Sequence, residues 1–243
     1  MLANLRPDEF KPEQNHLLAA LPEPVRTRMV PHMREVELKL GDVLYESGTT
    51  MTQVVFPVDA IVSLLYVMEN GSSAEISVVG NEGLVGISLF MGGESTSSRA
   101  VVQSAGWGYQ LPAKIVKDEF HRHSEMMILF LRYTQSLITQ MAQTAVCNRH
   151  HSIHQQLCRW LLLSIDRLEG NKLVMTQELI ANMLGVRREG VTEAAGKLQA
   201  LGIISYQRGE ITVLDRVKLE QHSCECYKVV KAESDRLLHY LPD

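Results

Sequence analysis

The hydrophobic and polar positions along the chain follow two different periodicities. Over residues 35–112 the chain has short strand-like runs, the first of which alternates Val36, Leu38 and Leu40 with charged residues before the run at residues 43–45. Turn-forming residues separate the runs, and Asn70-Gly71 is the strongest single hairpin signal. Many short strands with turns between them predict a β-sandwich or barrel. The expected strands lie at residues 53–57, 61–68, 74–79, 99–103 and 107–111.

The pattern becomes helical after residue 113. We expect a short helix at residues 114–120 and a much longer one, without Gly or Pro, at residues 125–148. Residues of the long helix recur at alternating spacings of four and three, as in the a/d seam of paired helices. This pattern favours a two-fold dimer interface, although a helix packed only on its own β-domain would show a similar spacing. The seam comprises Met127, Leu131, Thr134, Ile138, Met141 and Ala145.

Two short helical segments around Gly185 form the most informative stretch. An amphipathic helix at residues 153–168 precedes them. Thr176 is expected to cap the first segment, and Gly185 to end it in the left-handed conformation. Two helices this short and this close predict a helix-turn-helix. Two β-rich runs follow around Arg208-Gly209, and a hairpin directly after the second helix would be a wing.

The second helix of this motif carries side chains suited to reading bases. Arginine pairs with guanine O6 and N7, and glutamate accepts from cytosine N4, so we predict that Arg188 and Glu189 read base edges in the major groove. Arg187 and Thr192 are expected to read bases or to brace these readers. An ordinary helical hairpin with a solvated charged face would show a similar pattern. The expected phosphate contacts are Thr176, Gln177, Lys197 and Arg208.

Composition and charge set further bounds. The chain has 243 residues, of which 45% are hydrophobic and 21% charged, as in globular proteins of one large or two ordinary domains. No apolar run is long enough to span a membrane and the N-terminus lacks a signal-peptide layout, so we expect a cytoplasmic protein without a membrane partner. The net charge of −4 is not that of a non-specific nucleic-acid binder. DNA contact would therefore depend on the local placement of arginines.

The order of strands, long helix and winged helix-turn-helix resembles the Crp/Fnr superfamily of bacterial transcription regulators. The resemblance implies an α+β fold, with an antiparallel β-barrel or jelly-roll sensor domain at residues 1–123, a dimerisation helix at 124–149 and a winged helix-turn-helix domain at 150–243. It further implies a homodimer that binds palindromic double-stranded DNA, with RNA polymerase as an additional candidate partner. The segments that carry it are Gly41-Asp42-Val43-Leu44-Tyr45, Gly48, Ile61-Val62-Ser63-Leu64, Gly83-Leu84-Val85-Gly86 with Leu89-Phe90, and the stretch TQELIANMLGVRREGVTEAAGKLQALGII that begins at Thr176.

The resemblance also gives roles to residues of the second helix. In the family, a run similar to Arg188-Glu189-Gly190-Val191 opens the recognition helix and reads a G·C-rich part of a half-site. A further basic reader is common in the next turn, where this chain has Glu193. We therefore expect a preferred sequence that differs from the familiar palindromes.

The sensor segment departs from the cyclic-nucleotide-binding pattern that the resemblance implies. Such relatives hold the phosphate after a Gly-Glu-Leu run, with an Arg followed by Ser or Thr. Here Glu is missing after Gly86, and the nearest cation, Arg99, comes about three residues after the expected position. Successive side chains of a strand alternate between its two faces, so this odd shift points Arg99 to the opposite face. We expect either an unknown small-molecule effector or none. The candidate pocket residues are Gly83, Leu84, Val85, Gly86, Thr96, Ser97, Ser98 and Arg99.

No cofactor and no metal site are predicted from the cysteines and histidines. The chain has four cysteines and none before Cys147, so the N-terminal cluster of iron–sulfur sensors is missing. Cys224 and Cys226 form a C-x-C pair, but two ligands do not complete a zinc site. The cluster at His150, His151 and His154 is interpreted as a polar hinge. His121 and His123 are interpreted as solvated side chains rather than haem ligands.

Two other classes of protein remain as alternatives. An enzyme built on a cupin-like barrel would need histidine and carboxylate ligands on the strands, but no histidine occurs between His32 and His121. The chain also lacks the common hydrolase, P-loop and metalloprotease motifs, so we predict that it is not an enzyme. A protein–protein adaptor would use the winged helix to bind a partner other than DNA. It would bind DNA weakly, and alanine at Arg187, Arg188 or Arg208 would not change that binding.

Overall fold

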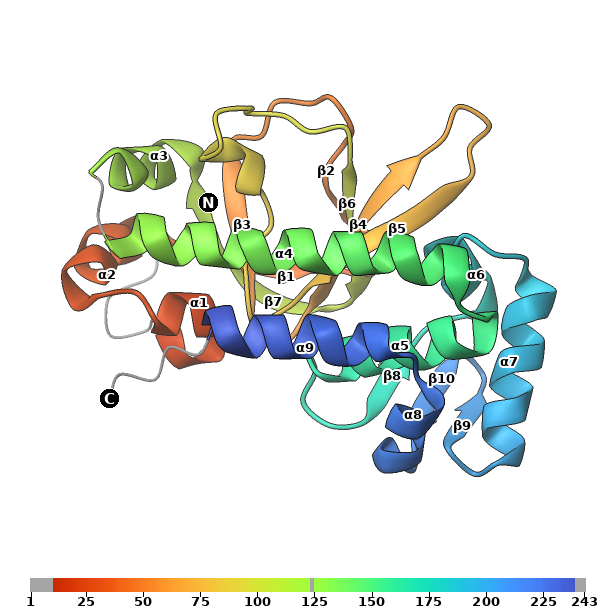
Figure 1. The fold of residues 1–243 in the computed structure, drawn as a ribbon. Coiled ribbons are helices and arrows are strands. Elements are labelled where there is room, and N and C mark those ends of the chain that lie inside the picture. The colour runs from red at the N-terminus through yellow and green to blue at the C-terminus, as the bar shows by residue number, and fades with distance from the viewer. Residues whose placement is uncertain (1–10, 123–124, 239–243) are drawn as a thin grey trace.

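The computed structural model describes residues 11–122 and 125–238, and arranges them around one long helix, α4 (Glu125–His150) (Figure 1). A β-domain packs against α4, and a smaller domain of helices and a three-stranded sheet lies at the end where α4 finishes. Helix α9 (Glu225–Leu238) returns from that domain and runs antiparallel beside α4. No helix among the described residues is both long and apolar enough to cross a membrane.

Two antiparallel sheets form the β-domain, with strand orders β1-β7-β3 and β2-β6-β4-β5. Their facing sides bury apolar residues such as Phe56, Val62 and Leu111. The expected antiparallel β-domain is confirmed, and the strand predicted at residues 53–57 has these limits in the structure. The strands are β1 (Arg34–Leu38), β2 (Val43–Tyr45), β3 (Gln53–Pro57), β4 (Ile61–Val67), β5 (Ser73–Val79), β6 (Arg99–Ser104) and β7 (Gly106–Pro112).

Short helices close the N-terminal end of the β-domain and connect it to α4. The amide of Asn15, which is fully buried, donates hydrogen bonds to Pro57 O (2.8 Å) and Gly83 O (2.9 Å), while its oxygen caps α1 by accepting from Leu18 N. These bonds fasten the first helices to the loops of the sheets. The helices are η1 (Pro12–Gln14), α1 (His16–Ala19), α2 (Glu23–Met29), η2 (Val30–His32), η3 (Ile87–Leu89) and α3 (Ala113–His121).

Aromatic side chains hold α4 on the β-domain. The Phe130 ring lies 6.3 Å from Phe56 and 5.2 Å from Phe90, measured between centroids. One turn along, the Tyr133 hydroxyl donates to Leu84 O at 2.8 Å. The Tyr133 ring approaches the backbone so closely that a Cβ on Gly83 would lie 2.0 Å from it. A glycine is therefore required at this contact between α4 and the segment at residues 83–86.

The C-terminal domain packs around α5 (Ile153–Ile165), whose Leu161 and Leu162 are fully buried. Ser152 caps α5 in a capping box with Gln155, and the break between α4 and α5 is confined to His151 and Ser152, within the predicted polar hinge. The remaining elements are β8 (Lys172–Val174), α6 (Gln177–Leu184), α7 (Arg188–Ala200), β9 (Ile204–Gln207), β10 (Glu210–Val213) and α8 (Arg216–His222).

Candidate nucleic-acid interface and sensor segment

Helices α6 and α7 form the predicted helix-turn-helix. The Thr176 hydroxyl accepts from Leu179 N and caps α6, and Gly185 ends α6 with a φ of 65°. Helix α7 then begins at Arg188 and buries Val191 and Leu198 against the rest of the domain. The apolar face of α7 therefore fixes the helix on its scaffold and leaves the opposite face at the surface.

An open groove lies between the start of α6, the start of α7 and the hairpin β9–β10. Arg188 reaches this groove from α7, and Arg208 reaches it from the hairpin turn. Both arginines are exposed, so their guanidinium groups are available to an anionic partner. The groove brings four of the predicted DNA-contact residues together on one surface. Its lining residues are Thr176, Gln177, Glu178, Arg188, Tyr206, Arg208 and Gly209.

The hairpin forms the predicted wing. Arg208 and Gly209 have φ values of 52° and 82°, as in the type I′ turns that join strands through two residues. The Tyr206 hydroxyl donates to Met175 O at 2.7 Å, and Tyr206 N donates to Gln199 Oε1 at 3.0 Å. These bonds fix the wing against α7 and against the residue that precedes the cap of α6, so Arg208 is held beside the groove.

The remaining predicted contacts are divided between the groove and another side of α7. Thr192 donates to Gln177 Oε1 at 2.7 Å, which ties α7 to the start of α6. Arg187 and Glu189 are exposed at the start of α7. Lys197 is also exposed, but it pairs with Glu193 at 2.7 Å and lies near the first turn of α5 rather than in the groove.

The predicted effector residues are held by packing and polar contacts within the β-domain. Leu84 and Val85 are buried in the core, and Gly86 precedes η3 with a φ of 112°. Ser98 is buried and its hydroxyl lies 3.2 Å from both Thr96 Oγ1 and Tyr45 Oη. The other predicted members are engaged as well, since Ser97 donates to Tyr66 Oη at 3.0 Å and Arg99 Nε lies 3.1 Å from a carboxylate oxygen of Glu46.

Family models match both halves of the chain. A cyclic nucleotide-binding domain matches residues 35–123, and a Crp-like helix-turn-helix domain matches residues 155–222. The two matches together cover more than half of the sequence, in the order in which the Crp/Fnr superfamily combines these domains. The chain belongs to the Crp/Fnr superfamily. By its domains it is a Crp/Fnr-type transcriptional regulator.

Solved structures show the same fold as this Crp/Fnr regulator. FixK2 from Bradyrhizobium japonicum is 14% identical with a TM-score of 0.66, and the match covers 79% of this chain and 98% of that one. A CRP-family transcriptional regulator from Thermus thermophilus is 15% identical with a TM-score of 0.64, covering 77% and 96%. The c-di-GMP-responsive global regulator CLP of Xanthomonas campestris is 12% identical with a TM-score of 0.63, covering 79% and 99%. No curated protein matches the regulator by sequence.

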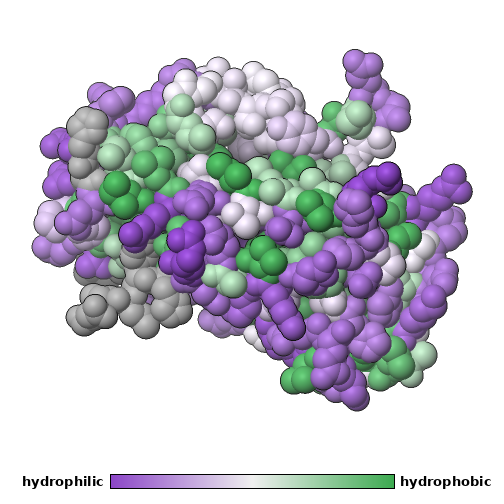
Figure 2. Space-filling model, in the orientation of Figure 1, coloured by the Kyte–Doolittle hydropathy of each residue, from purple (hydrophilic) through white to green (hydrophobic). Residues whose placement is uncertain are grey.

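The predicted dimer seam on α4 is partly exposed and partly turned inward. Leu131, Ile138 and Ala145 form an exposed column at seven-residue spacing, and Leu131 and Ile138 are 45% and 53% exposed. Apolar side chains are visible along α4 in Figure 2. Met127 and Met141 are half-buried, whereas Thr134 is buried and donates to Phe130 O within its own helix. Three of the six predicted residues are therefore exposed on α4, where Ile128 and Val146 are exposed as well.

A buried polar network joins the β-domain of the regulator to its helix-turn-helix domain. Glu75 on β5 accepts from Trp160 Nε1 on α5 at 3.1 Å. Ser63 Oγ lies 2.6 Å from both Glu75 Oε2 and Gln103 Oε1, and Gln103 donates to Ser164 of α5. A hydroxyl has a single proton, so the network is complete when a protonated Glu75 donates to Ser63 and Ser63 donates to Gln103. Burial agrees with this state, because it raises the pKa of Glu75 to about 7.

We predict a pH-dependent stability that Glu75→Gln removes. The pKa of Glu75 is about 7 in the folded protein against 4.5 for an exposed glutamate. Its contribution to the free energy of unfolding is therefore fully present below about pH 4.5 and is lost as the pH rises through 7. The wild type is expected to lose on the order of 3 kcal/mol of unfolding free energy over this range. Glu75→Gln removes this dependence, because its amide makes the bonds of the protonated acid at every pH. Urea unfolding at several pH values measures it, with Glu69→Gln in an exposed turn as the control. Parallel pH profiles for wild type and Glu75→Gln would contradict it.

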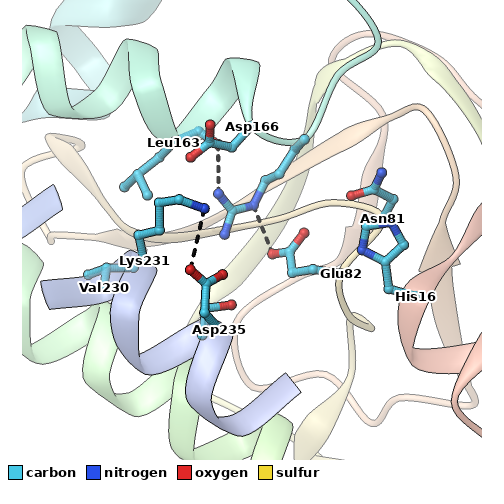
Figure 3. Close-up of a pocket in the computed structure, with 10 residues that line it drawn as sticks. His16, Asn81, Glu82, Leu163, Asp166, Val230, Lys231 and Asp235 are labelled. Atoms are coloured by element: carbon cyan, nitrogen blue, oxygen red, sulfur yellow. Dashed lines mark hydrogen bonds and ion pairs between the residues drawn. The ribbon is translucent and has the colours of Figure 1, made fainter. Parts of the chain in front are cut away.

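A charged cavity lies where the β-domain, α5 and α9 meet (Figure 3). Arg167 occupies its wall, donating to Glu82 Oε1 at 2.8 Å and to Leu163 O at 2.6 Å, and Lys231 pairs with Asp235 at 3.5 Å. The Arg167–Glu82 pair is a second polar link between the β-domain and the C-terminal domain. Sequence reasoning missed this link and the Glu75 network, because both depend on contacts between residues 85 positions apart.

The histidines singled out from the sequence have different environments. His121 is exposed at the end of α3, and His123 lies outside the described residues. His154 faces His222, with ring nitrogens 3.2 Å apart, and burial together with the neighbouring His222 lowers the pKa of His154. His150 is exposed, whereas His151 turns towards α9.

Proposed function

We propose that this Crp/Fnr-type regulator is a homodimer that binds a specific, two-fold-symmetric DNA sequence and acts by binding rather than by catalysis. The groove shared by α6, α7 and the wing carries this proposal, because it sets Arg188 beside two phosphate-binding candidates, Thr176 and Arg208. Arg188 and Glu189 read base edges in the major groove. Thr176, Gln177 and Arg208 contact the DNA backbone, and these contacts set the position of α7 along the major groove.

The exposed column on α4 supports the dimer. Large apolar side chains on a helix surface are stabilised when a second copy covers them, and the seven-residue spacing of Leu131, Ile138 and Ala145 suits a parallel or antiparallel helix pair. A two-fold dimer sets its two recognition helices about 34–36 Å apart, so that they enter successive major grooves. The operator is then an inverted repeat.

The effector of the sensor domain, in this proposal, is not a cyclic nucleotide. An anionic phosphate needs a cation, and the candidate Arg99 lies 3.1 Å from the carboxylate of Glu46, whose negative charge opposes a bound anion. The segment at residues 83–86 contacts α4 through the bond from Tyr133 to Leu84, so a ligand that moved this segment would also move the dimerisation helix. The same displacement would reach the recognition helices.

Selection of DNA from a random pool tests the proposal. The purified wild-type protein is expected to recover an inverted repeat, alone or after addition of a cell metabolite extract that supplies an effector. The same selection with Arg188→Ala is expected to lose the motif, whereas Lys172→Ala, an exposed lysine outside the groove, keeps it. Recovery of no motif under either condition would contradict the proposal and favour a winged helix that binds protein.

A further inference from the structure

Four side chains from the ends of two helices converge beside the break between α4 and α5. Cys147 lies in the last turn of α4 and His151 follows the end of that helix, while Cys224 and Cys226 flank the first residue of α9. Their ligand atoms all lie within 4.8 Å of one another. The three cysteines are at most 3% exposed. The cluster therefore combines two segments that are 73 or more positions apart in the sequence.

The local structure points the four side chains at the same point. Cys147 and His151 are four residues apart, and His151 N donates to Cys147 O at 3.0 Å, so both side chains project from one side of the helix end. Cys224 and Cys226 lie at the start of α9, which packs antiparallel on α4. This packing brings the C-x-C pair against the other two residues.

The spacing of these atoms suits a tetrahedral zinc ion. Zinc binds sulfur at about 2.3 Å and imidazole nitrogen at about 2.0–2.1 Å, so two sulfurs on one ion lie roughly 3.7 Å apart and a sulfur and a nitrogen roughly 3.5 Å apart. The sulfurs of Cys147 and Cys224 are 3.5 Å apart, and Cys226 Sγ lies 3.5 Å from His151 Nδ1. An ion at the centre needs little movement of its ligands.

The surroundings of the cluster match those of a metal-bound histidine. His151 turns Nδ1 towards Cys226 and Nε2 towards Glu225, whose carboxylate oxygen lies 3.4 Å away. A carboxylate that accepts from the second ring nitrogen fixes the tautomer and orientation that a metal ligand needs. Gln156 donates to His151 O at 2.9 Å and holds the backbone of that ligand.

A buried cation complements the charge of such a site. One zinc ion with three thiolates and a neutral histidine has a net charge of −1. Arg159 on α5 is 5% exposed, so its positive charge is buried close to the cluster. Its Nη2 donates to Thr144 Oγ1 at 2.6 Å, while its Nε has no hydrogen-bond partner among the described residues. A negative metal complex nearby would stabilise this charge.

We propose that Cys147, His151, Cys224 and Cys226 bind one zinc ion per chain as a structural site. The site has four protein ligands and leaves no position for substrate, which is the arrangement of structural rather than catalytic zinc. Zinc clamps the end of the long helix to the start of α9, next to the first turn of the DNA-binding domain. Its role is to fix the angle at which α4 enters that domain.

Metal analysis of the full-length protein tests the site. Protein purified under reducing conditions without chelator is expected to contain about one zinc per chain. Cys147→Ser, Cys224→Ser and Cys226→Ser are each expected to lose it, whereas Cys158→Ser, a buried cysteine outside the cluster, retains it. Zinc contents equal in wild type and all four variants would place the metal elsewhere and overturn the proposal.

Cobalt binding to the unmodified protein provides a test that does not depend on the folding of variants. Reduced, metal-depleted protein is expected to give the d–d bands of tetrahedral cobalt and a thiolate-to-cobalt charge-transfer band that saturates at about one ion per chain. Zinc should then displace the cobalt and remove these bands. Absence of the charge-transfer band, or a reductant-resistant Cys147–Cys224 disulfide in its place, would overturn the proposal.

Glu225→Gln separates the positioning role of this carboxylate from the ligands. The variant keeps all four ligands, so the zinc content at saturation should be unchanged while the affinity falls by about 10- to 100-fold. Competition with a coloured chelator measures the affinity. Glu220→Gln on α8 is the matched control and should bind as wild type does. An unchanged affinity in Glu225→Gln would show that the carboxylate does not orient His151.

Discussion

Replacing Leu131 and Ile138 together by glutamate should convert the protein to a monomer and weaken binding to a two-fold-symmetric operator by about 10²- to 10⁴-fold. Both side chains are exposed, at 45% and 53%, so the substitutions leave the core of the monomer intact. In a dimer they would bring four carboxylates into an apolar seam. Each monomer then binds one half-site independently, without the gain in affinity that comes from linking two DNA-binding domains. Sedimentation velocity and fluorescence anisotropy on the recovered operator measure the two effects.

The control for this variant is Val217→Glu on α8. Val217 is 65% exposed and apolar, like the seam residues, but it lies on a different helix. It should leave the oligomeric state unchanged. Circular dichroism checks that the double variant keeps its helices. A double variant that remains a dimer would contradict the proposed seam, and a wild type that is monomeric at micromolar concentration would contradict the dimer itself.

Arg188→Ala should cost about 1–3 kcal/mol of binding free energy and relax the preference at one base pair in each half-site. For one contact, this corresponds to a dissociation constant that is about 5- to 150-fold larger. The side chain is exposed at the start of α7, so its loss leaves the buried face of the helix, with Val191 and Leu198, untouched. Titrations on the operator and on its single-base variants measure the change.

Arg208→Ala provides the contrast, because a wing residue on a phosphate carries no sequence information. It should weaken all sequences by a similar factor and reduce the slope of log affinity against log salt by about one. Lys197 is expected from the sequence to behave in the same way, although it lies beside Glu193 and outside the groove. If Arg188→Ala weakened every sequence equally, α7 would bind DNA without reading it.

The elements that the sequence predicts well depend on local signals. Thr176 and Gly185 mark the two ends of α6 because a hydroxyl caps a helix and glycine adopts the left-handed conformation, and both do so in the structure. The hairpin at Asn70-Gly71 is likewise present, with Met68 N bonded to Ser72 O. Short β-rich runs between turn residues located the strands, including β3 and β4, which bury successive residues on both faces.

The features that sequence reasoning missed depend on packing between distant segments. Thr134 fits the a/d spacing of a seam, but spacing does not tell which side of a helix faces its own β-domain, and this residue is buried there. Cys224 and Cys226 were interpreted as an incomplete pair, since nothing local shows that α9 returns along α4 to Cys147 and His151. Glu75 gave no signal at all, because its partner Trp160 lies in the other domain.

Guanine methylation interference on the selected operator tests the central claim most directly. Methylation of guanine N7 blocks the atom that Arg188 is proposed to contact in the major groove. The account predicts interference at one guanine in each half-site, with the two positions separated by about one helical turn of 10–10.5 base pairs, and its loss in Arg188→Ala. Interference that is absent, unpaired, or unchanged in Arg188→Ala would contradict the reading of DNA by a pair of α7 helices.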